Sequence, residues 1–141
     1  MNNLALTISN GVGDGNGNIQ ISAGFFRDMD DQFGTNLQLL PSNLMFNNKN
    51  LIINSSDIVY SKDRIVINNF IISENNMLLL GVDGVASKNA DDKIRAYFNN
   101  TELGNLLSIL NIANINGLIN GGISIAQALN EPIIKTDNFR I

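Results

Sequence analysis

The sequence predicts a mainly β protein, a curved antiparallel meander that forms an open groove or a flattened barrel, with one short α-helix over about 101–110. Asparagine and isoleucine are the two most frequent residue types, which combines a turn-former with a strand-former. Apolar and polar residues alternate over many short stretches, as in strands with one dry face. No linker or charge run divides the 141 residues, so 1–141 is expected to form a single unit.

The first half of the chain predicts short strands joined by polar turns. Residues 4–8 and 19–22 alternate, so we expect a hairpin whose loop spans 10–18. An acidic loop is expected over 27–35. Further short strands are expected at 37–40, 44–46, 51–53 and 57–60.

The second half has the clearest strand patterns, at 65–72, 77–86 and 93–99. The apolar rhythm of the first of these strands is kept only if one extra residue is absorbed at Asn68 and Asn69. We therefore predict a β-bulge at these two residues.

One segment has helical spacing instead. Thr101 is expected to be the N-cap of a helix over 101–110, and Glu102 lies where a negative charge favours the helix N-terminus. A strand with glycines in step is expected next, over 115–125, and a last strand after Pro132. Four leucines of the helix form one apolar stripe that should plug an opening of the sheet: Leu103, Leu106, Leu107 and Leu110.

The chain contains no cysteine and no histidine, which removes several classes of chemistry. Thiol nucleophiles, Ser-His-Asp triads, disulfides and zinc sites built on Cys or His are excluded. A net charge of -4 with scattered Lys and Arg argues against a nucleic-acid partner. No stretch approaches the roughly 18 apolar residues of a spanning helix. We expect a protein that is not an enzyme and holds neither a metal nor a cofactor.

The glycine-rich segment from Gly11 to Asn18 resembles a ligand-binding loop only superficially. A strand follows it, and neither glycine spacing of a phosphate-binding loop fits. A calcium loop fits poorly, because Ile19 stands at the glycine position and Phe25 at the position of the bidentate glutamate. A glycine hairpin is the main interpretation, and a weak cation site is the minor one.

Carboxylates cluster twice, at Asp28, Asp30 and Asp31 and again at Asp91 and Asp92. Acid-base catalysis by two carboxylates needs a pocket that gives them different environments. These residues lie in polar segments beside basic residues, so solvated turns are expected.

Several stretches are apolar on both faces, among them 51–53, 77–80 and 133–134. One explanation is a closed β-sandwich, an interaction or adhesion module in which these residues form the core. The other is a curved sheet whose inner face meets acyl chains or a partner polypeptide. Composition alone favours the sandwich and leaves both folds open.

Five patterns follow one another in a characteristic order. A proline-serine turn precedes short strands, and I-x-V-x-N-F-x-L-like and L-x-I-x-G-x-x-S-like strands come next. A D-L-x-x-L-like helix and a G-x-x-x-G strand follow. These patterns stand at 40–47, 65–72, 80–87, 101–106 and 117–121. In this order the chain resembles the TamB family of translocation and assembly modules, AsmA-like proteins of the bridge-like lipid-transfer superfamily, in its Bacteroidetes-like form.

The resemblance covers residues 39–141, with 1–38 as leading strands. It departs from the family at Leu51, where many relatives have an aromatic residue, and at Glu102, where the acid before the helix is displaced. It implies an internal segment of a periplasmic protein with its inner-membrane anchor outside this chain. Implied partners are phospholipid acyl chains or unfolded outer-membrane polypeptide, and an Omp85-type barrel reached through other parts of the protein. Because strand edges accept further strands, we also expect that the segment can form an edge-to-edge dimer.

Strand parity and the resemblance together predict which side chains line the groove. These are Ile65, Ile67, Phe70, Ile72, Leu78, Leu80, Val82, Ile94, Ala96, Phe98, Ile119, Ile123 and Ile125.

Overall fold

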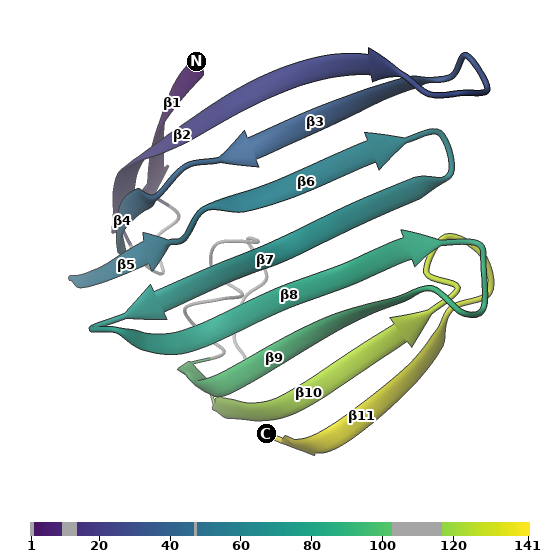
Figure 1. The fold of residues 1–141 in the computed structure, drawn as a ribbon. Coiled ribbons are helices and arrows are strands. Elements are labelled where there is room, and N and C mark those ends of the chain that lie inside the picture. The colour runs from purple at the N-terminus through teal and green to yellow at the C-terminus, as the bar shows by residue number, and fades with distance from the viewer. Residues whose placement is uncertain (1, 10–13, 47, 103–116) are drawn as a thin grey trace.

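The computed structural model describes residues 2–9, 14–46, 48–102 and 117–141. These residues form strands joined by turns, with no helix among them, and all strands pair antiparallel in one continuous curved sheet (Figure 1). The predicted fold class is confirmed as a curved antiparallel sheet that does not close into a barrel. The strands are β1 Asn2–Ser9, β2 Asp14–Arg27, β3 Phe33–Leu39, β4 Ser42–Phe46, β5 Lys49–Ile53, β6 Ser56–Ser61, β7 Arg64–Glu74, β8 Met77–Ser87, β9 Lys93–Glu102, β10 Leu118–Ala126 and β11 Ile133–Arg140.

The sheet is a meander, because β3 with β4 and β5 with β6 are each one long strand with a break. Leu39 pairs with Ser56 and Ser42 with Ile53, so one register continues across both breaks. Strand β7 pairs with β6 along its first part and with β5 along its last part. The remaining strands follow in chain order, from β7 to β11.

The register places most aliphatic side chains on one face of the sheet, while Ile52, Val59, Val66, Ile71 and Val85 lie on the other. Ile67 lies opposite Ile58 on one side and opposite Gly84 on the other, and directly opposed residues share a face. This surface, called the aliphatic face below, is continuous from β2 to β10. It includes Ile19, Ile21, Leu37, Leu39, Leu44, Leu51, Ile53, Ile58, Ile65, Ile67, Phe70, Ile72, Leu80, Val82, Ala86, Ile94, Ala96, Phe98, Ile119, Ile123 and Ile125.

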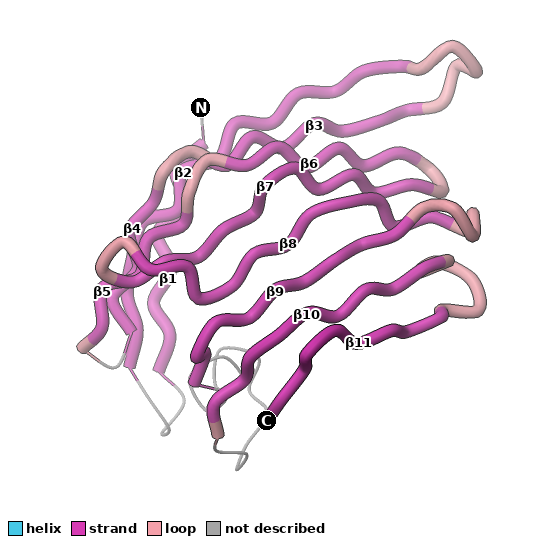
Figure 2. Tube along the Cα trace, turned by 60° about the horizontal axis from the view of Figure 1, so that its bottom comes forward, coloured by secondary structure: helices cyan, strands magenta, loops and turns pink. Residues whose placement is uncertain are grey.

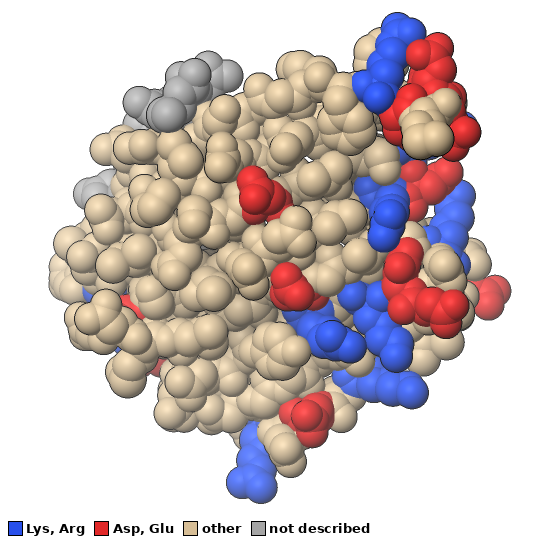
Figure 3. All heavy atoms as spheres, in the orientation of Figure 1, with Lys and Arg blue, Asp and Glu red and all other residues tan. Residues whose placement is uncertain are grey.

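The opposite surface, called the polar face below, carries amide and charged side chains exposed to solvent. Most of the molecule's Lys, Arg, Asp and Glu gather at one end of the sheet, where the β2–β3, β6–β7 and β8–β9 turns lie (Figure 3). Two ion pairs join these turns: Lys88 with Asp63 at 3.0 Å and Arg64 with Asp92 at 3.9 Å. Exposed members of the polar face are Asn18, Gln38, Asn43, Asn50, Asp57, Asp83 and Arg95.

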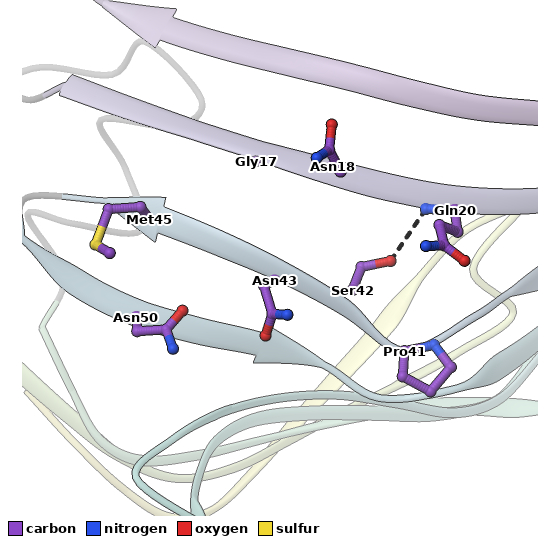
Figure 4. A pocket seen from close by; sticks show the side chains of 8 residues that line it. All are labelled: Gly17, Asn18, Gln20, Pro41, Ser42, Asn43, Met45 and Asn50. Atoms are coloured by element: carbon purple, nitrogen blue, oxygen red, sulfur yellow. Dashed lines mark hydrogen bonds between the residues drawn. The ribbon is translucent and has the colours of Figure 1, made fainter.

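The break between β3 and β4 is held by a serine hydroxyl in place of a backbone partner. The Gln20 N–H donates to Ser42 Oγ at 3.0 Å (Figure 4). The Ser42 hydroxyl in turn donates to the Leu40 carbonyl at 2.8 Å. Pro41 lies between Leu40 and Ser42 and has no N–H that would need a hydrogen-bond partner. Ser42 is buried, with 3% of its surface exposed. Between the pairs on either side of the break, β3 and β4 have one residue more than the facing part of β2, and the chain bends there.

The break between β5 and β6 lies next to the predicted bulge in β7. The buried Ser56 hydroxyl donates to the Asn68 carbonyl at 2.7 Å. Asn69 has a φ of 53°, and its N–H donates to Asp83 Oδ1 at 3.1 Å. The pairing of β7 with β8 shifts between Ile67 and Phe70, which confirms the bulge at Asn68 and Asn69.

A second row of irregular positions crosses β8, β9, β10 and β11. The Asn100 N–H donates to Asn120 Oδ1 at 2.8 Å, and Asn120 Nδ2 donates to Asn100 Oδ1 at 2.9 Å. Asn100 and Asn138 both have a positive φ, and the registers on both sides of β10 shift nearby. These two rows of breaks accompany the bends visible in the strands (Figure 2).

The predicted helix over 101–110 is wrong at its start. Thr101 and Glu102 are the last residues of β9 and pair with Ile119 and Leu118 of β10. The buried Thr101 hydroxyl donates to the Leu79 carbonyl of β8, so it is engaged with a neighbouring strand and does not accept from a helix N-terminus. The rest of the predicted helix, with Leu103, Leu106, Leu107 and Leu110, lies outside the described residues.

The predicted loop over 10–18 is also too long. Strand β2 begins at Asp14, which pairs with Ser9 of β1, and residues 10–13 lie outside the described residues. Gly15 to Asn18 pair with β1 on one edge and with β4 on the other. The glycines after position 14 therefore belong to a strand that is paired on both sides.

The curvature brings together side chains from strands that are not neighbours in the sheet. Lys49 Nζ of β5 lies 2.9 Å from Glu102 Oε1 of β9, although β7 and β8 stand between these strands. The hydrogen bond with Glu102 raises the pKa of Lys49 above its ordinary value. The ion pair thus spans the concave side at one end of the sheet.

The described strands form one sheet and not the two packed sheets of a sandwich. The buried apolar residues among them all lie on the aliphatic face: Leu51, Ile53, Ala86 and Ile119. The other side chains named above for this face are half-buried, so the aliphatic face is only partly withdrawn from solvent.

Candidate functional site

The aliphatic face is the candidate site, and it contains every predicted groove residue except Leu78. The pairings of β7, β8, β9 and β10 bring the rest onto one surface. They are Ile65, Ile67, Phe70, Ile72, Leu80, Val82, Ile94, Ala96, Phe98, Ile119, Ile123 and Ile125.

Leu78 lies on the polar face, which corrects its predicted place in the groove. Ile72 pairs with Leu80 and Ser73 with Leu78, so β8 holds one extra residue between these pairs. The Leu78 side chain lies beside Gly81 on the polar face, since a Cβ added to this glycine would be 3.6 Å from Leu78 Cδ1. The irregularity reverses the parity on which the prediction relied.

The aliphatic face also extends over strands that the sequence did not assign to the groove. Ile53 pairs with Ile72, and Ile58 with Ile67, so β5 and β6 continue the surface. Leu37 lies opposite Ile58 and adds β3. The sequence predicted these strands. Placing their side chains on one face also requires the register between strands, which the pattern of a single strand does not contain.

Two aromatic side chains pack against each other where the aliphatic face meets β11. The rings of Phe98 and Phe139 meet edge to face, with centroids 6.3 Å apart and planes at 73°. Gly121 pairs with Phe98, its φ is 104°, and an added Cβ would overlap the Asn138 carbonyl of β11.

Charged residues on the aliphatic face are confined to its ends. Lys49 and Glu74 lie at one end and Arg27 at the other, by the pairings of β5, β7 and β2. The rows between them carry aliphatic, aromatic and small hydroxyl side chains. Such a surface offers dispersion contacts and removal of apolar groups from water, and it offers no charged group to a ligand.

The polar face has a shallow hollow of about 370 Å³ beside the β3–β4 break (Figure 4). Uncharged side chains line it, most of them amides: Asn18, Gln20, Asn43 and Asn50 with Met45, Pro41 and Ser42. Within the described ranges, no three Asp or Glu side chains approach closely enough to hold a metal ion. Nor do these ranges include a helix long and apolar enough to cross a membrane.

Comparison of the chain with models of protein families, with curated proteins and with solved structures finds no match. The resemblance to the TamB family therefore rests on the order of the sequence patterns.

Proposed function

We propose that this chain is a non-enzymatic segment of a TamB-like protein of the bacterial envelope. In this role its aliphatic face holds phospholipid acyl chains in the periplasm, on their way between the inner and outer membranes. The observation that carries the proposal is a single curved sheet with one continuous aliphatic surface. The half-burial of most side chains on this face supports a surface that a ligand can reach.

The energetics of such a face suit an acyl chain. Each methylene removed from water contributes about 0.8 kcal/mol, so a few of them offset the ordering of the lipid tail. Contacts with an acyl chain are not directional and need no charged group. This agrees with the lack of charge between the ends of the face. Lipids of different chain length would bind by the same surface.

Unfolded outer-membrane polypeptide is the second expected cargo, and the composition of the face favours lipid over it. A polypeptide brings backbone N–H and C=O groups that need hydrogen-bond partners when they leave water. The central rows of the aliphatic face provide few polar side chains for them. An Omp85-type barrel would be met by other parts of the protein.

The proposal is tested by lipid retention. The protein carrying Leu80→Asp and Phe98→Asp, two substitutions on the aliphatic face, should lose phospholipid that co-purifies with the unaltered chain, as measured by mass spectrometry of extracted lipid. Tyr97→Asp is the matched control, because Tyr97 neighbours Phe98 but lies on the polar face and is 49% exposed. Far-UV circular dichroism verifies that β content is kept. Equal lipid retention by all three proteins would refute the proposal.

A further inference from the structure

A second hollow lies on the polar face over β10, between β9 and β11, which are its two neighbours in the sheet (Figure 1). Its volume of about 420 Å³ lies within the range of small-molecule sites, roughly 300–1,000 Å³. At the hollow, β10 carries only Gly122 and Ser124 on this face, whereas longer side chains stand on both neighbouring strands. The register therefore makes β10 the floor of the hollow and β9 and β11 its two walls.

Two cations face each other across the serine. Arg95 and Lys135 both lie opposite Ser124, one on each side. Their strands are about 10 Å apart, or two strand spacings, which long side chains can bridge around a small anion. Asp83 lies opposite Arg95 on β8 but accepts the Asn69 N–H at 3.1 Å. Neither cation forms an ion pair with any residue that the structure describes, so both are available to a ligand.

The next row of the sheet adds an aromatic ring and a carboxylate. Tyr97 lies opposite Gly122, and Asp137 lies on the far side of that glycine. Gly81 flanks Tyr97 from β8. An added Cβ would lie 3.9 Å from the Tyr97 ring at Gly81 and 3.6 Å from it at Gly122. Because both neighbours lack a side chain, the ring stays 49% exposed beside a hydrogen-bond acceptor.

These groups match the chemistry of an acidic sugar. The face of an aromatic ring carries partial negative charge, and the C–H groups on one side of a pyranose ring are weakly positive, so the two pack together. The Asp137 carboxylate can accept hydrogen bonds from sugar hydroxyls, and Arg95 and Lys135 can bind a carboxylate or phosphate substituent. A polyanion is disfavoured, because the net charge of the protein is -4 and the hollow itself contains a carboxylate.

We propose that this hollow binds a single hexose unit that carries one anionic group. The sugar ring lies against Tyr97, and its hydroxyls donate to Asp137. Its carboxylate or phosphate lies over Ser124, between Arg95 and Lys135. The hollow is shallow and open, so binding is weak, with a Kd on the order of 1 mM. These side chains belong to the polar face, so this site and the aliphatic face proposed for lipid can be tested independently.

The test titrates four probes into the full chain labelled for NMR: glucuronate, glucose-6-phosphate, glucose and inorganic phosphate. The two acidic sugars should shift the amide signals of Tyr97, Gly122 and Ser124 most. Glucose and inorganic phosphate should each bind about tenfold more weakly, because each lacks one half of the contacts. Binding of only one acidic sugar would support the proposal and identify the anionic group as a carboxylate or a phosphate.

Two substitutions separate the charge from the ring. Arg95→Gln should lower the affinity for the acidic sugars about tenfold, to that for glucose, and Tyr97→Leu should weaken all three sugars by a similar factor. Lys62→Gln is the matched control for charge, since it removes one cation at the exposed β6–β7 turn. Tyr60→Leu replaces the other tyrosine of the chain, which lies on the aliphatic face. Neither control should change the affinity.

Four results would each overturn the proposal. They are the absence of any shift at about ten times the expected Kd, equal affinity for glucose and the acidic sugars, and shifts confined to residues away from the hollow. The fourth is inorganic phosphate that binds as tightly as glucose-6-phosphate, since the sugar would then contribute nothing. Unchanged binding by Arg95→Gln or Tyr97→Leu would do the same, and dispersed amide signals verify that each variant is folded.

Discussion

At the scale of single residues, asparagine and glycine make the bends of this sheet possible. Most of the non-glycine residues with positive φ are asparagines, including Asn69, Asn100 and Asn138 at the irregular positions. Asparagine enters the left-handed region more readily than other side chains do. Gly84 and Gly121 supply the same freedom where a neighbouring backbone comes close. The high asparagine content of the chain thus has a structural cause beyond ordinary turns.

Gly84→Ala should destabilise the protein strongly. Gly84 has a φ of 120°, and an added Cβ would overlap the Lys93 carbonyl oxygen of β9, which cannot move without breaking the ladder. We expect the free energy of unfolding to fall by about 2–4 kcal/mol in urea titrations. Gly24→Ala is the matched control, because nothing lies within 4 Å of its added Cβ, and its effect should stay within about 1 kcal/mol. Similar losses for both variants would contradict this account of Gly84.

At the scale of elements, two serine hydroxyls supply hydrogen bonds at the breaks where long strands bend. Ser42 and Ser56 sit at the breaks of β3/β4 and β5/β6, both buried, and their hydroxyls take hydrogen bonds that a regular ladder would have made through the backbone. Together with the Asn68–Asn69 bulge, these breaks form a row across the sheet. The strands can then curve around the aliphatic face.

Ser42→Ala should cost about 1–3 kcal/mol of unfolding free energy, because it leaves the partly buried Gln20 N–H without its acceptor. Ser55→Ala removes an exposed hydroxyl at the neighbouring break and should change stability by less than about 0.5 kcal/mol. Thermal or urea unfolding compares the two. A Ser42 variant as stable as the Ser55 variant would show that the hydroxyl does not hold the break.

Regular strands and the β7 bulge could be predicted from the sequence. The alternation of apolar and polar residues assigns side chains to the two faces, and the extra residue at Asn68 and Asn69 visibly interrupts that alternation. The irregularity in β8 cannot be recognised in the sequence, because leucines lie on both sides of it and either parity then appears apolar. Leu78 was therefore assigned to the wrong face. Thr101 has the chemistry of a helix N-cap, but pairing with Ile119 overrides this local preference. The roles of Ser42 and Ser56 depend on partners far along the chain, which no local pattern encodes.

At the scale of the whole molecule, the chain builds a curved surface with one aliphatic and one polar face. The Lys49–Glu102 ion pair shows the extent of the curvature, because it joins β5 and β9, which are separated by β7 and β8 in the sheet. Among the described residues, charge on the aliphatic face is kept to its ends. The central claim is that phospholipid acyl chains occupy the aliphatic face.

Photo-crosslinking from neighbouring positions on opposite faces tests this claim most directly. The photoreactive residue p-benzoylphenylalanine replaces Ile123 or Ile67 on the aliphatic face, or the adjacent Ser124 or Val66 on the polar face. Each variant is illuminated with phospholipid vesicles, and mass spectrometry detects the covalent lipid adduct. The account predicts adducts at Ile123 and Ile67 and none above background at Ser124 and Val66. Adducts of equal yield on both faces, or on the polar face alone, would contradict it.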